Sequence, residues 1–293
     1  MRVGVVDVGS NTVRLLVAAP SGRGVEAVRE ERAVLGLGEE IELHGRIGDV
    51  RLARTAERAR EYARLARKAG VARLDVIVTA PGRQAENAHD LVAALERACR
   101  HDVRVLSTDE EGRLAFLGAV AQARRLPDRV AVCDVGGGST EIVVGTPGGH
   151  VGWSCSVELG SLRLTGRAGI DDPPTKRALA AAREIAEEAL AELEPPPVDA
   201  ALATGGSARA LRRLVGRTLA EEDIADAVRM LRKRRAEETA RIFDLDVSRA
   251  RTLPAGATIL RAAARTLGVP FEVARGGLRE GAALELLADL LAA

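Results

Sequence analysis

The sequence predicts an α/β protein made of two domains with similar topology. Three observations lead to this prediction. Strands alternate with helices in the first half, a strand–glycine loop–strand pattern occurs twice, and 293 residues suit one large or two medium domains. The composition agrees, because 46% apolar and 29% charged residues are ordinary values for a globular protein.

Expected strands and helices alternate in the first half of the chain. "RRLPDR", with Pro127 and several charges, indicates a boundary, so we expect domains at 1–125 and 126–293. The last helix is expected either to stay with the second domain or to pack back on the first. The expected elements of the first domain are strands at 2–6 and 13–19, a helix at 53–70, a strand at 73–80, a helix at 87–100, a strand at 103–107 and a helix from about 107 to 125.

Charge and cysteine content exclude several classes of protein. The net charge of +1 does not point to nucleic acid or to a membrane surface. Cys99, Cys133 and Cys155 are too widely spaced for a disulfide framework or a zinc site. The chain has neither a signal h-region nor an apolar run of about 18 residues. We therefore expect a cytoplasmic protein without nucleic-acid or membrane partners, and a homodimer is the generic expectation for its assembly.

An internal repeat links the two expected domains. Without gaps, "DVGSNTVRLLV" from Asp7 aligns with "DVGGGSTEIVV" from Asp134. Both copies run from a strand through Asp-x-Gly and a small polar loop into a second strand. Two unrelated hairpins could share such turn chemistry, but the repeated aspartate and the long matching context favour a true repeat.

The chemistry of the two loops suits a phosphate and a metal ion. Glycines let a ligand approach backbone N–H groups, which together can hold an anion. An aspartate at the strand end would repel a phosphate directly, yet it suits Mg²⁺, which takes carboxylate and phosphate oxygens together. Neither loop is a Walker loop or a dinucleotide fingerprint, because a strand follows the glycines where those motifs have a helix.

A third glycine loop, "ATGGSARAL" at 203–211, leaves a strand and enters a helix. The first N–H groups of a helix form a natural phosphate or nucleotide site. The sequence thus predicts three phosphate-binding loops, two of which are related by the repeat.

These loops resemble the phosphate and nucleotide loops of the actin-like ATPase superfamily. Further segments resemble the exopolyphosphatase and guanosine pentaphosphate phosphohydrolase (Ppx/GppA) family. These segments are "STDEEGRLAFLGAV", "SVELGSLRLTGRAGIDDPPT", "SRARTLPAGATIL" and "GGLREGAAL", and together with the loops they extend from residue 3 to about residue 285.

The resemblance implies two actin-like (ribonuclease H-like) domains with a cleft between them, in a short two-domain member. It also implies hydrolysis of a terminal phosphoanhydride with Mg²⁺ or Mn²⁺. The expected substrate is inorganic polyphosphate, or alternatively guanosine penta- or tetraphosphate.

Glu111 aligns with the family's catalytic glutamate, thought to act as general base on the attacking water. A local interpretation competes with this role, because Thr108–Glu111 and Ser107–Glu110 each fit a capping box. One glutamate could cap the helix while the other faces the substrate. Gly112 stands where the family usually has alanine.

The resemblance also assigns metal and phosphate contacts. Asp134 is expected on the metal, Glu141 on the metal or the attacking water, and Asp7 on a second or water-bridged metal contact. The expected phosphate-binding residues are Ser10, Asn11, Thr12, Arg14, Arg83, Gly136, Gly137, Gly138, Ser139, Thr140, Gly205, Gly206, Ser207 and Arg249.

Several arginines depart from the family pattern or leave two interpretations open. Pro81-Gly82 precedes Arg83 where the family has ordinary residues, and Arg251 stands where an aspartate is usual. Arg279 is either structural or functional. The run "RMLRKRR" at 229–235 either lines a path for polyphosphate or forms a solvated helix face.

Two other functions compete with hydrolysis. One is an actin-like kinase that transfers phosphate from ATP, against which the "EEGRL" segment argues. The other is a non-catalytic module that senses polyphosphate or an alarmone, which the altered "TAPGR" loop and Arg251 keep open.

Overall fold

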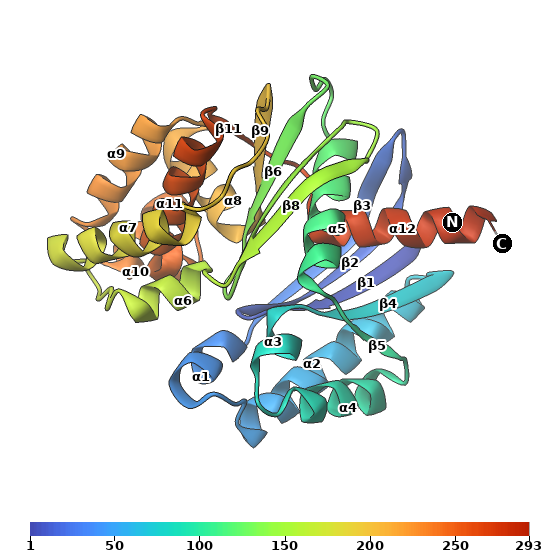
Figure 1. Ribbon diagram of the computed structural model, residues 1–293. Coiled ribbons are helices and arrows are strands. Elements are labelled where there is room, and N and C mark those ends of the chain that lie inside the picture. The colour runs from blue at the N-terminus through green and yellow to red at the C-terminus, as the bar shows by residue number, and fades with distance from the viewer. Residues whose placement is uncertain (293) are drawn as a thin grey trace. The chain divides into compact units, whose positions relative to one another are not determined.

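The computed structural model describes residues 1–292, and the chain divides into two compact units. Unit 1 contains Met1–Gln122 and the segment that starts at Gly276, whereas unit 2 is Ala123–Arg275. Each unit has its own β-sheet with helices packed against it (Figure 1). The chain therefore leaves unit 1 after Gln122 and returns to it at Gly276. None of the helices in the described part of the chain is long and apolar enough to cross a membrane.

The sheet of unit 1 has five strands in the order β3-β2-β1-β4-β5. Its strands are β1 (Val3–Val8), β2 (Thr12–Ser21), β3 (Gly24–Val34), β4 (Arg73–Val78) and β5 (Val103–Val105). The first three form an antiparallel meander, and β4 and β5 run parallel to β1. Because helices cover both faces, the central strand reads as a nearly continuous apolar run, "VGVVDV".

Alternate residues of these strands supply two separate cores. Val6 and Val8 face one side, beneath α1, α2 and α4, whereas Val3 and Val5 face the other, beneath α5 and α12. The helices of unit 1 are α1 (Leu37–His44), α2 (Asp49–Lys68), α3 (Ala80–Gln84), α4 (Ala88–Cys99), α5 (Thr108–Ala121) and α12 (Leu278–Ala292). Unit 1 is thus a three-layer α/β/α arrangement.

The sheet of unit 2 has six strands in the order β10-β11-β9-β6-β7-β8. Its strands are β6 (Val130–Val135), β7 (Thr140–Gly145), β8 (Val151–Val157), β9 (Ala200–Thr204), β10 (Thr218–Leu219) and β11 (Phe271–Val273). Here too the first three strands form an antiparallel meander, followed by two strands parallel to the first. The order β8-β7-β6-β9-β11 repeats β3-β2-β1-β4-β5, which confirms the predicted actin-like α/β class.

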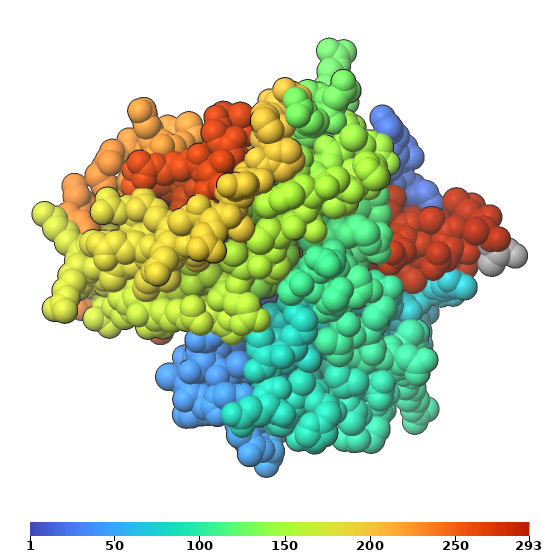
Figure 2. Space-filling model, viewed as in Figure 1, coloured from blue at the N-terminus to red at the C-terminus, as the bar shows by residue number. Residues whose placement is uncertain are grey.

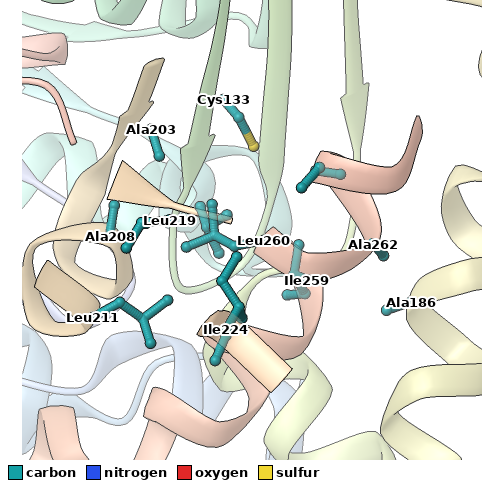
Figure 3. Close-up of a cluster of buried hydrophobic side chains, with 14 of the residues drawn as sticks. Cys133, Ala186, Ala203, Ala208, Leu211, Leu219, Ile224, Ile259, Leu260 and Ala262 are labelled. Carbon is teal, nitrogen blue, oxygen red and sulfur yellow. The ribbon is translucent and has the colours of Figure 1, made fainter. Parts of the chain in front are cut away.

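The core of unit 2 is centred on the long helix α11 (Val247–Leu267), most of which is buried. Ile259 and Leu260 of α11 meet Leu211 and Ile224 from neighbouring helices beneath the sheet (Figure 3). The other helices are α6 (Ser161–Arg167), α7 (Lys176–Leu190), α8 (Gly205–Val215), α9 (Glu221–Leu231) and α10 (Ala236–Phe243). α11 contacts all five of them, and so it fixes their positions relative to the sheet.

Several expected boundaries differ from the structure, and the helix expected at 53–70 spans Asp49–Lys68. The strand expected over 73–80 ends at Val78, because Ala80–Gln84 forms α3 with Pro81 in its first turn. The helix expected to reach about Arg125 ends at Ala121.

Glycines bring α5 and α12 into close contact. A Cβ atom on Gly118 would clash with the backbone oxygen of Gly277, and one on Gly281 would clash with the backbone oxygen of Leu114. Backbone atoms cannot move aside as a flexible side chain can. The two helices can therefore approach this closely only with glycine at these positions.

We predict that Gly281→Ala destabilises the protein by about 1–3 kcal/mol, the usual cost of overpacking a tight contact. The matched control is Gly166→Ala in α6, where an added Cβ would meet nothing within 4 Å. Urea unfolding followed by circular dichroism measures both free energies of unfolding. An equal stability of the two variants would contradict the glycine contact between α5 and α12.

Candidate functional site

The first glycine loop connects β1 to β2 in unit 1. Asp7 pairs with Arg14 across the two antiparallel strands, and the Gly9 N–H closes the loop by donating to the Thr12 carbonyl at 3.0 Å. The Arg14 Nε donates to the Thr12 hydroxyl at 3.2 Å. The loop therefore holds a carboxylate, a guanidinium and a hydroxyl at the same end of the strand pair.

The carbonyl groups of this loop are occupied by the segment that starts α1. The Gly38 N–H donates to the Ser10 carbonyl at 2.7 Å, and the Gly36 N–H donates to the Asn11 carbonyl at 3.1 Å. A carbonyl oxygen would repel a phosphate, so engaging these oxygens elsewhere leaves the loop better suited to an anion.

The second glycine loop, between β6 and β7 of unit 2, repeats this geometry. Asp134 pairs with Glu141, and the Gly136 N–H donates to the Ser139 carbonyl at 3.0 Å, as Gly9 does to Thr12. The predicted repeat is thus confirmed at the level of strand register and loop closure. One difference is chemical, because Glu141 stands where the first loop has Arg14.

The start of α6 holds the carbonyl groups of the second loop. The Ser161 N–H donates to the Gly136 carbonyl at 2.9 Å, and the Leu162 N–H donates to the Gly137 carbonyl at 3.0 Å. Gly160 permits this approach, because a Cβ there would collide with the backbone of Gly137. In both units, then, the helix after the meander fixes the loop by hydrogen bonds to its carbonyl oxygens.

Glu141 is almost completely buried, with 2% of its surface exposed. The Ser156 hydroxyl on β8 donates to its Oε1 at 3.0 Å. Burial raises the pKa of the neighbouring Cys133 thiol well above its usual value, and the charges of Asp134 and Glu141 raise that pKa further. The carboxylate pair therefore creates a negative potential at the end of β6, which favours a bound cation.

The third glycine loop adjoins the second within unit 2. Gly205 adopts φ +84°, and a Cβ there would lie 2.5 Å from the Asp134 Oδ1. A Cβ on Gly206 would collide with the guanidinium of Arg249, in the first turn of α11. The structure thus brings together Asp134, Glu141, the two glycines and Arg249.

Glu111 lies in the first turn of α5, where the capping alternatives are now resolved. Ser107 is the N-cap, and Glu110 completes the capping box by accepting from the Ser107 N–H at 2.9 Å. This backbone hydrogen bond also lowers the pKa of Glu110 below its ordinary value. Because Glu110 caps the helix, the carboxylate of Glu111 is left for another role.

That carboxylate is paired with Arg83. The Arg83 Nη2 donates to the Glu111 Oε2 at 2.9 Å, while its Nη1 donates to the Leu106 carbonyl at 2.6 Å. The Glu111 side chain is only 11% exposed. Arg83 is therefore held by two acceptors of unit 1, and it fixes the orientation of Glu111.

The unusual Pro81-Gly82 sequence has a local explanation. A Cβ on Gly82 would lie 2.9 Å from the Val105 Cγ1 and 3.0 Å from the Val78 Cγ1. Glycine thus allows α3 to pack closely on β4 and β5, and the loop still delivers Arg83 to Glu111.

Comparison with known proteins now identifies the family. The sequence matches the Ppx/GppA phosphatase family over residues 16–290. The chain belongs to this family. Exopolyphosphatase 1 of Mycobacterium tuberculosis is 32% identical over 308 residues, which cover 98% of this chain and 88% of that protein.

Two solved structures are similar over nearly the whole chain. The Aquifex aeolicus member of the Ppx/GppA family has a TM-score of 0.83 and 28% identity, over 100% of this chain and 98% of that one. An exopolyphosphatase from Cytophaga hutchinsonii has a TM-score of 0.87 over 99% of this chain and 98% of that one. Because the identity is only 21%, this similarity is evidence for the fold alone.

A divalent cation, which this family implies, fits the carboxylates of unit 2. Among residues 1–292, no three His, Cys, Asp or Glu side chains gather into a group that could hold a metal by themselves. Asp134 and Glu141, however, form a cross-strand pair beside the glycine loops. A pair of this kind suits Mg²⁺ or Mn²⁺, which would complete its coordination with phosphate and water oxygens.

Two hydroxyls of the predicted phosphate set are buried inside unit 2. Thr140 is fully buried, and its hydroxyl donates to the Leu159 carbonyl at 2.6 Å. The Ser207 hydroxyl is also fully buried, packs against Gly256 of α11, and has no hydrogen-bond partner among the described residues.

The remaining arginines also have clear positions. Arg279 is buried in unit 1 and pairs with Glu30 at 3.2 Å. Arg251 is exposed and lines a small hollow with Asp171 and Asp172. Two positions along α11 separate it from Arg249, so the two side chains leave the helix on nearly opposite sides.

Sequence reasoning missed Ser156 and Ser161, which contact the second loop. Each is a single serine with no motif around it. A cross-strand alignment of β7 with β8 could have found Ser156, because it pairs with Glu141 in register.

We predict that Ser207→Ala raises the free energy of unfolding by about 1 kcal/mol, because it removes a buried hydroxyl with no partner. Ser161→Ala is the matched control with the opposite sign. Its hydroxyl is equally buried but donates to the Gly136 carbonyl at 3.1 Å, so we expect a loss of about 1 kcal/mol. Urea unfolding measures both, and a loss of stability in Ser207→Ala would show that its hydroxyl has a partner.

Proposed function

We propose that this chain is an exopolyphosphatase-type hydrolase that releases terminal phosphate from inorganic polyphosphate by attack of water. The observation that carries the proposal is the environment of Glu111. It is a nearly buried carboxylate at the start of α5, relieved of capping by Glu110 and held by Arg83. Such a carboxylate suits a general base for the attacking water.

Glu111 takes a proton from the attacking water in this proposal. The ion pair with Arg83 orients the carboxylate. Phosphate oxygens of the substrate would compete for the Arg83 guanidinium, a fork that binds phosphate in two places. Substrate binding would then release the carboxylate for proton transfer.

The loops of each unit bind phosphate oxygens. In unit 1, Arg14 and the backbone from Ser10 to Thr12 serve this role. In unit 2, the backbone from Gly136 to Ser139, the first turn of α8 and Arg249 do so. Most of the acceleration comes from positioning and charge stabilisation, as is usual for phosphoryl transfer.

Asp134 and Glu141 hold a divalent cation, Mg²⁺ or Mn²⁺. When bound there, the cation supplies charge neutralisation for phosphate oxygens. The Ser156 hydroxyl orients Glu141, and Gly205 leaves room beside Asp134. Asp7 is proposed as a second, water-bridged contact in the equivalent position of the first loop.

The exopolyphosphatase name of the mycobacterial relative supports polyphosphate over guanosine pentaphosphate as substrate. Phosphate release from polyphosphate, guanosine pentaphosphate and ATP, measured in parallel with Mg²⁺ and with Mn²⁺, tests this preference. Release only from the nucleotide would reverse the assignment.

We predict that Glu111→Gln lowers kcat by about a hundredfold or more, because an amide cannot accept the proton from water. The matched control is Glu110→Gln, which keeps an oxygen to cap Ser107 and should retain kcat within about twofold. Steady-state phosphate release measures both, with circular dichroism to verify folding. Comparable kcat values for the two variants would exclude Glu111 as the base.

We also predict that EDTA abolishes phosphate release and that Asp134→Asn raises the cation concentration needed for half-maximal activity by about tenfold. Loss of one carboxylate weakens a site that depends on a pair. Asp128→Asn, an exposed position with the same change of charge, is the control. Titration of activity with Mg²⁺ and Mn²⁺ distinguishes them, and an unchanged titration for Asp134→Asn would place the metal elsewhere.

A further inference from the structure

A second pocket in unit 2 is rich in positive charge. It is an open pocket between α7, α9 and α11 with a volume of about 350 Å³, within the range of ligand sites. Six of its lining side chains are cationic, and one, Glu187, is a carboxylate. Figure 2 shows α7, in yellow, on the surface of the molecule.

This pocket is separate from the glycine loops. Its α11 residues, including Arg261 and Arg265, lie in the second half of that helix, whereas Arg249 lies in the first turn. Twelve residues of α-helix separate Arg249 from Arg261, about 18 Å along the axis. None of the residues assigned to the candidate active site lines the pocket.

Half of the cationic side chains already have acidic partners. Arg261 pairs with Glu221 at 3.0 Å, and Arg265 pairs with Glu187 at 2.8 Å. Arg229 pairs with Asp226 on its own helix. The buried Nε of Arg261 nevertheless has no hydrogen-bond partner among the described residues.

The other half have no such compensation. No ion pair of Lys176, Arg183 or Arg232 is found among residues 1–292, although all three line the pocket. Lys176 and Arg183 belong to α7, whereas Arg232 directly follows α9. Three uncompensated cations in one pocket attract anions.

Their spacing favours an extended anion. Lys176 and Arg183 lie about 10 Å apart along α7, so charges distributed along a chain match them better than one tetrahedral anion does. Between the cations, Leu179, Val228 and Ala262 form an apolar floor. We propose that this pocket is a second binding site, for a chain of linked phosphates, either inorganic or attached to a nucleoside.

Part of the segment "RMLRKRR" belongs to this pocket. Arg229 and Arg232 line the pocket, whereas Lys233 and Arg235 of the same run do not. The segment therefore divides into residues that line the pocket and residues that lie outside it.

The test is the binding of inorganic triphosphate by isothermal titration calorimetry, in EDTA to suppress turnover. The double variant Arg183→Gln/Arg232→Gln removes two uncompensated cations from the pocket. The matched control, Arg177→Gln/Lys233→Gln, removes two cations that lie close in sequence to these but do not line the pocket. Circular dichroism verifies that both variants fold.

We expect the pocket variant to bind triphosphate at this site at least about tenfold more weakly, since each lost contact is charge-assisted. The control should stay within about twofold of the original protein. Equal weakening in both variants would mean that overall charge explains the binding, and it would overturn the proposal. Full retention of binding in the pocket variant would overturn it as well.

Two further measurements test whether a nucleoside contributes to binding and whether the pocket binds independently of the candidate active site. If GTP and triphosphate bind alike, the phosphate chain suffices; if GTP binds more tightly, its base packs on the apolar floor. Binding of neither probe overturns the proposal. Asp134→Asn alters the candidate active site alone, so its pocket binding should be unchanged even if the proposed hydrolase function fails.

Discussion

The hydrogen bond from the Gly136 N–H to the Ser139 carbonyl, with its counterpart from Gly9 to Thr12, is the constraint on which the candidate site depends. Each bond closes a loop between two antiparallel strands and so fixes the register. The register in turn pairs Asp134 with Glu141 and Asp7 with Arg14. A slip of one residue would turn each side chain to the other face of the sheet and disperse the charges.

In both units, the first residues of the following helix also hold the glycine loop in place. In both units, N–H groups that have no partner within their own helix donate to the loop carbonyls. The same hydrogen bonds thus give partners to the first N–H groups of the helix and fix the shape of the loop. The same architecture carries different charges in the two units, because Asp7 pairs with Arg14 in one copy, whereas Asp134 pairs with Glu141 in the other.

The α/β class and the repeat were predictable, because both depend on local patterns, namely apolar strands and Asp-x-Gly loops. Several elements were not predicted, and β3 and α1 show the reasons. β3 is an edge strand with many charged, exposed residues, so its apolar pattern is weak. The short helix α1 follows Gly36 at φ +65° and has no side-chain cap, so the usual start signals are missing.

The site was only partly predictable for a related reason. The sequence could not say which glutamate of "DEEG" caps α5, because Glu110 and Glu111 fit equally well. The structure decides this through the contacts of Ser107 with Glu110 and of Arg83 with Glu111. The second contact joins residues that are distant in sequence, and such pairs leave no local pattern. The return of α12 to unit 1 has a consequence for synthesis on the ribosome. Unit 2 is one continuous segment, whereas one face of the sheet of unit 1 stays partly uncovered until α12, which follows unit 2, has been synthesised. Unit 1 is first in the sequence, yet it is completed last.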